Sequence, residues 1–190
     1  MYRIPSWIST WRLWRKLHPD SWLLKEQRDH GSHYVPSYGP QLESHQDVKN
    51  VLSALRQEIR LTRDTLVFGV TSDGENEVFP LNILSREPAV IEFRLKGRRL
   101  VMFQDSSEHA AGVYIPELNG RLLTFSTMKN GQDIQFTDDQ THSLWGFDGR
   151  AASGTLKGSI LTPVVTIRCH YQEWVAAFPK SQIYHQTIPH

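Results

Sequence analysis

From Thr65 onward, hydrophobic and polar positions alternate with a period of about two, which is typical of half-buried β-strands. The apolar runs fall at residues 66–70, 77–81, 90–95, 100–103, 112–115, 122–125, 133–136 and 164–167. Turn signals separate many of them: Asp73-Gly74, Lys96-Gly97, Asn119-Gly120 and Asn130-Gly131. Asp-Gly and Asn-Gly strongly favour two-residue hairpin turns, because the central residues of such turns need positive φ. The pattern therefore predicts an antiparallel β meander, as a sheet or an open barrel.

Three segments have helical spacing instead. Val48, Val51, Leu52, Leu55 and Ile59 predict one amphipathic helix near residues 45–60, and Ser44 supplies an N-cap. Residues 171–178 predict a short closing helix, and the tryptophan-rich residues 1–24 predict an N-terminal helix. The expected fold class is α+β and mainly antiparallel, because hairpins rather than helical crossovers join the strands.

The N-terminal helix has two interpretations. Arg12, Arg15 and Lys16 give it a basic side, which fits a membrane-surface helix, whereas tryptophan at helical spacing also fits packing on the domain. A repeat at an offset of 160 residues favours packing, because it indicates a duplicated helix and turn. The matched pairs are Trp11 with Tyr171, Trp14 with Trp174, Pro19 with Pro179 and Ser21 with Ser181.

Domain organisation follows from these elements and from a polar loop rich in glycine and proline at residues 25–43. We expect residues 1–43 to form an N-terminal helix and loop extension, the remnant of a preceding repeat. Residues 44–190 are expected to form a single domain, since a chain of 190 residues with 39% hydrophobic content can bury a full core.

Composition narrows the partners and the compartment. The formal net charge of +1 supplies no general field to attract nucleic acid. Cys169 is the only cysteine, so no intramolecular disulfide can form. No stretch reaches the length of a transmembrane helix, and no signal peptide is apparent. The sequence as given therefore predicts a cytoplasmic protein, and the alternative is an exported protein of which this sequence is a truncated form.

The segment from Phe136 to Gly158 is dense in turn-forming residues around one tryptophan. It resembles the signature of the bacterial and archaeal family known as domain of unknown function 3179. The resemblance extends over most of the chain, with further landmarks at Gly69-Val70, at residues 79–81 and 119–125, and at Trp174 and Pro179. The signature positions are Asp139, Ser143, Trp145, Gly149, Gly154 and Gly158.

The resemblance implies a chemical site that this chain has lost. The family carries two cysteines separated by two residues after a strand, with a histidine-glutamate pair upstream, and such thiolates can bind copper or zinc or exchange electrons. Here Gln104 and Ser107 fill the cysteine positions, and Glu87 fills the upstream histidine position. Neither an amide nor a hydroxyl replaces a thiolate. No resident cofactor is therefore predicted, with copper or zinc as the alternative.

Other candidate sites each have a structural alternative. His109 and Glu87 could act as an acid and base pair if the fold brings their two strands together. The alternative is that both are ordinary polar residues at strand ends. Asp138, Asp139 and His142 either line a pocket or cap backbone amides in a tight turn.

Three further groups have the same ambiguity. Asp29, His30 and His33 have the donor types of a zinc site but lie in a polar loop. Cys169 lies between two cationic neighbours that can lower a thiol pKa, or is a structural thiol. The cluster of Lys96, Arg98 and Arg99 fits a solvated turn as well as a phosphate contact.

No nucleophile elbow, phosphate-binding loop or nucleotide fingerprint is present, which weakens hydrolase and nucleotide-binding hypotheses. The leading hypothesis is a non-catalytic binding or structural interaction module with an unknown protein or small-molecule partner, and the tryptophan-rich N-terminus is the expected partner surface. The alternatives are a metal-binding or redox-related enzyme with a rearranged site at Glu87, His109 and His142, and a membrane-surface protein.

Overall fold

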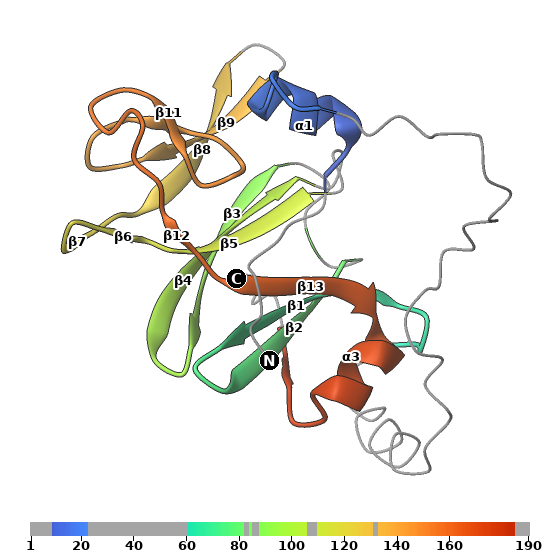
Figure 1. The fold of residues 1–190 in the computed structure, drawn as a ribbon. Coiled ribbons are helices and arrows are strands. Elements are labelled where there is room, and N and C mark those ends of the chain that lie inside the picture. Colours follow the sequence, from blue (N-terminus) through green and yellow to red (C-terminus); the bar gives the residue numbers. More distant parts are fainter. Residues whose placement is uncertain are drawn as a thin grey trace, which may run out of the picture.

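A computed structural model describes residues 9–22, 61–81, 84, 88–105, 110–130 and 133–184 (Figure 1). The helix predicted near residues 45–60 and the loop predicted at 25–43 lie outside these ranges, as do the first eight residues. The predicted division at residue 43 stays a prediction.

Within the described residues, antiparallel sheets form the body of the protein, which confirms the predicted α+β fold rich in β meander. The first sheet has the order β13-β1-β2-β14, formed by Val165–His170, Leu66–Ser72, Glu75–Pro80 and Gln182–Ile183. The second has the order β12-β5-β4-β3, formed by Thr162–Pro163, Ala110–Ile115, Arg98–Asp105 and Ala89–Leu95. The third has the order β11-β10-β9-β8, formed by Ala151–Ser153, Leu144–Trp145, Asp133–Asp138 and Phe125–Asn130. A short hairpin joins β6 (Glu117–Leu118) to β7 (Arg121–Leu122).

The predicted hairpin turns form where the sequence places them. Asp73, Lys96 and Asn119 have φ values of 50°, 51° and 52°, and the glycine after each also has positive φ. Residues 131–132 lie outside the described ranges, although Asn130 and Asp133 pair across them.

Two features of the topology differ from a simple meander. The run predicted at 122–125 is broken, because the amide of Leu123 donates to the carbonyl of Pro116 and that of Thr124 to the side chain of Gln140. In addition, β14 pairs with β2 in parallel. A period of two reports which residues are buried and carries no information on where a chain leaves one sheet for another.

The central strand β4 is buried on both faces, so it separates two parts of the core. Leu100 and Met102 pack with Phe68, Val70 and Phe79 of the first sheet. Val101 and Phe103 pack with Phe125, Phe136 and Trp145 of the third sheet. Successive side chains of a strand point to opposite faces, and Gln104 therefore lies on the side of Leu100 and Met102.

Two helices lie at opposite ends of the molecule (Figure 1). The first, α3 (Tyr171–Ala177), covers β1 and β2 with three buried side chains, Tyr171, Trp174 and Val175. The second, α1 (Trp11–Leu17), packs on the third sheet through Leu13 and Leu17, while Trp11 and Trp14 are exposed. The interpretation that this helix packs on the domain is therefore confirmed, but Leu13 and Leu17 make the contact rather than Trp11 and Trp14.

Candidate functional site

The segment from Phe136 to Gly158, called the signature block below, is organised by one buried carboxylate, Asp138. Its Oδ1 accepts a hydrogen bond from the amide of Thr141 at 2.6 Å. Its Oδ2 accepts from the hydroxyl of Thr141, the amide of Ser143 and the indole of Trp145, at 2.9, 3.1 and 3.0 Å. Burial raises the pKa of Asp138, but hydrogen bonds from Trp145, Thr141 and Ser143 outweigh it, so the pKa lies below its ordinary value. The interpretation that this aspartate caps backbone amides is confirmed.

The remaining signature residues hold the same turn together. Asp139 accepts hydrogen bonds from the hydroxyls of Thr124 and Ser126. Ser143 is buried, and its hydroxyl accepts from the amide of Leu156 at 3.0 Å. A side chain at Gly154 would lie 2.7 Å from the Cα of Ser143, so glycine permits this close approach. Gly149 and Gly158 also have positive φ, which glycine adopts without strain.

His142 is exposed on this turn, with φ of 55°, and its amide donates to the carbonyl of Asp138. Its predicted partners Glu87 and His109 lie outside the described residues, as do Ser107 and the cluster of Asp29, His30 and His33. Among the described residues, no group of three or more histidine, cysteine, aspartate and glutamate side chains is placed to hold a metal ion.

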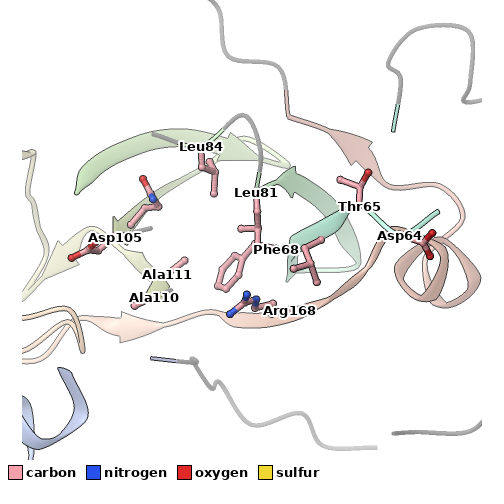
Figure 2. A pocket seen from close by; sticks show the side chains of 11 residues that line it. Asp64, Thr65, Phe68, Leu81, Leu84, Asp105, Ala110, Ala111 and Arg168 are labelled. Carbon is pink, nitrogen blue, oxygen red and sulfur yellow. The ribbon is translucent and has the colours of Figure 1, made fainter. Parts of the chain in front are cut away.

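Gln104 is buried at the end of β4 and lines a cavity of about 540 Å³ (Figure 2). The cavity lies between the first and second sheets, where β1 and β13 face the ends of β4 and β5. Its walls include the side chains of Phe68, Leu81, Leu84 and Ala111. The position that the family resemblance assigns to a cysteine therefore opens into a cavity, a feature that the sequence did not indicate.

Cys169 is a free thiol, and its surroundings do not activate it. Burial raises its pKa to about 11, with a further contribution from Glu173 and an opposing one from a hydrogen bond to Trp174. The side chain faces the apolar cluster under α3. The idea that neighbouring cations lower this pKa is wrong, because desolvation dominates.

Glu77 is a buried acid that sequence reasoning missed. Its side chain lies on the same face of β2 as Phe79, and the atom Oε2 is buried without a hydrogen-bond partner in the structure. Burial raises the pKa of Glu77 from 4.5 to about 7. The alternation of β2 could have revealed it, since a glutamate two residues before a core phenylalanine shares its face.

Replacing Glu77 with glutamine is expected to stabilise the protein at pH 8 by about 1–2 kcal/mol, with an advantage that shrinks toward pH 4. A carboxyl whose folded pKa lies above its unfolded value loses stability as pH rises between the two, here from 4.5 to about 7. Screening by nearby water makes the effect smaller than the full linkage. Urea unfolding at both pH values measures it, with Glu75→Gln on the exposed start of β2 as control. An advantage that does not change with pH would contradict the prediction.

The sequence repeat corresponds to a structural repeat. The indole nitrogen of Trp14 donates to the hydroxyl of Ser21 at 2.8 Å, and that of Trp174 donates to Ser181 at 2.8 Å. The ring centroids of Trp14 and His18 lie 4.5 Å apart, and those of Trp174 and Phe178 lie 4.4 Å apart. The C-cap residues of both helices have ψ of 69°. Two segments 160 positions apart in the sequence therefore each form a helix and turn of the same geometry.

The fold and the site together define a class: an α+β protein of antiparallel sheets with a largely apolar cavity at the end of its central strand. Sequence comparison identifies the family, because residues 1–181 match the one described as Protein of unknown function (DUF3179). The chain belongs to this family, as the signature block indicates. No curated protein and no solved structure matches the chain. Within the described residues, no helix is long and apolar enough to cross a membrane.

Proposed function

We propose that this protein is a non-catalytic interaction module that binds a partner protein through the exposed face of α1. The supporting observation is a contrast between two copies of one element. Tyr171 and Trp174 in α3 are 3% and 1% exposed, whereas the matched Trp11 and Trp14 in α1 are 44% and 37% exposed. In α3, the face that carries Tyr171 and Trp174 packs on the first sheet. The matching face of α1, which carries Trp11 and Trp14, is therefore suited to pack on a sheet of a partner protein.

The attachment of α1 to its own domain leaves this face outward. Leu13 and Leu17, one turn apart, pack on the core around Phe103 and Trp145. His18 Nε2 lies 4.0 Å from a carboxylate oxygen of Asp148. These contacts use one side of the helix, and the tryptophans project from another.

The α3 copy also indicates the chemistry of the partner surface. Trp174 lies against Gly69 of β1, where a Cβ would stand 2.0 Å from the indole. A partner that accepts Trp14 in the same way needs a glycine in a sheet facing the helix. Arg15 occupies the position of the buried Val175, so this surface also needs a carboxylate opposite Arg15. Tryptophan and arginine are the side chains most enriched at binding hot spots.

A photo-crosslinking residue, benzoylphenylalanine, placed at position 11 in cells that naturally produce the protein tests the proposal. We expect one discrete crosslinked protein, and a loss of about tenfold in its yield when Trp14→Ala is added, because hot-spot truncations cost about 2 kcal/mol or more. Position 122, where Leu122 is 46% exposed, is the control and should give no such adduct. Circular dichroism checks that the variants remain folded.

The proposal fails if position 11 yields no discrete protein adduct or yields the same adducts as position 122. Crosslinks to lipid alone would also overturn it, in favour of a membrane-surface role for the basic and aromatic helix.

A further inference from the structure

Arg168 places a cation on the face of the first sheet that is turned toward the second sheet, opposite the face covered by α3. It pairs with Phe68 in register, and Thr166, on the same face of β13, is buried. The alternate residues Ile167 and Cys169 face the cluster under α3 instead. Arg168 is half-buried, and within the part of the chain that the structure describes its guanidinium forms no hydrogen bond or ion pair. A half-buried guanidinium gains from an anionic partner in direct contact, because no hydrogen bond compensates the desolvation of its N–H groups.

The cavity beside Arg168 is suited to a small organic molecule. Its volume of about 540 Å³ lies within the usual range of ligand pockets. Phe68, Leu81, Leu84 and Ala111 supply apolar walls, and the Gln104 amide can both donate and accept a hydrogen bond. Figure 2 shows the Arg168 side chain below the Phe68 ring, between Asp64 and Asp105 on the two sides.

The two aspartates restrict the charge of the ligand. Asp64 is exposed and Asp105 is half-buried, and both repel an anion that approaches Arg168. For a dianion such as phosphate, the repulsion by these two aspartates is about twice that for a monoanion, because the Coulomb energy scales with charge. A planar carboxylate with a single charge meets less of it and matches the fork of a guanidinium with two parallel hydrogen bonds.

We propose that this cavity binds a small monocarboxylate with an apolar body, whose carboxylate pairs with Arg168 and whose body lies against Phe68, Leu81 and Leu84. The site is distinct from the α1 face, which lies at the third sheet. Neither proposal depends on the other.

Two pairs of probes test the charge selectivity on the unmodified chain. Phenylacetate and hexanoate are the carboxylates, and phenylacetamide and phenethylamine are the neutral and cationic counterparts. In proton-nitrogen NMR spectra we expect the carboxylates to shift the amide signals of Phe68 and Ala111 and to bind at least tenfold more tightly than either counterpart. This comparison needs no variant and so does not depend on variant stability.

Substitutions then test the residues. Arg168→Met keeps an apolar stem and should weaken carboxylate binding at least tenfold, whereas Arg121→Met, at an exposed arginine of β7, should leave it unchanged. Asp64→Asn should strengthen binding several-fold, because it removes a repelling charge. Trp14→Ala should have no effect.

Three results would overturn the proposal. One is no carboxylate binding up to about 10 mM, which is weaker than the usual range for specific sites. Another is equal binding of phenylacetamide, and the third is undiminished binding by folded Arg168→Met protein.

Discussion

Replacing Gly69 with alanine is expected to lower the free energy of unfolding by about 3 kcal/mol. The added Cβ would lie 2.0–2.3 Å from three atoms of the Trp174 indole. That indole is 1% exposed, and its hydrogen bond to Ser181 fixes it from the other side. Either β1 or α3 must therefore move. Urea or thermal unfolding followed by circular dichroism measures the loss.

Gly74→Ala is the matched control for this experiment. Gly74 has φ of +83°, and a Cβ added there would have nothing within 4 Å, so alanine meets backbone strain without a collision and should cost about 1 kcal/mol. A double variant with Trp174→Ala should lose much less than the sum of the single losses, because the collision disappears. Equal losses at Gly69 and Gly74, or full additivity with Trp174→Ala, would contradict the steric explanation.

Asp138→Asn is expected to lower the free energy of unfolding at pH 7 by about 2–3 kcal/mol. The carboxylate of Asp138 accepts four hydrogen bonds with its two oxygens. Asparagine has only one acceptor oxygen, and its NH2 group would face a hydrogen-bond donor where the second oxygen was. An amide that keeps its oxygen at the Oδ2 position turns its NH2 group toward the amide of Thr141, so that donor loses its acceptor. Trp145 exchanges a charged acceptor for a neutral one, so near-ultraviolet circular dichroism of the tryptophans should change as well.

The loss should depend on pH in a defined direction. The pKa of Asp138 is lower in the folded state than its ordinary 3.8, so its stabilisation is present above about 3.8 and is lost as pH falls through the folded pKa. The difference between the wild type and Asp138→Asn should therefore shrink from pH 7 to pH 3. Asp139→Asn, at an exposed carboxylate with two hydroxyl donors, is the control and should cost less than about 1 kcal/mol. A constant difference across this range would refute the assignment of a charged carboxylate.

Local chemistry was readable from the sequence where it acts between near neighbours. The Asp73-Gly74 and Asn119-Gly120 turns were predictable because positive φ at both central residues selects these residue types. The capping role of Asp138 was predictable for a similar reason, since it bonds amides only three and five residues away. The repeat of Trp14 and Trp174 was also visible as a spacing.

Contacts between distant residues were not readable in this way. Gly69 was visible as a family landmark, but the reason for it lies in Trp174, which no local pattern links to β1. Arg168 was considered only as a neighbour of Cys169, and its place in a cavity follows from the pairing of β13 with β1. The candidate residues Glu87, Ser107 and His109 lie outside the described part of the chain, so their roles stay predictions.

The sequence by itself determined the family, the antiparallel α+β class, the hairpin turns and the duplicated helix, because each depends on residues close together in the chain or on a repeated spacing. Only the tertiary structure decided that Trp174 is buried while Trp14 is exposed, and that Gln104 and Arg168 line one cavity. The physical reason is that burial is set by which sheet a side chain meets. Contacts between sheets join strands that are far apart in the chain, so no periodic pattern in the sequence reports them.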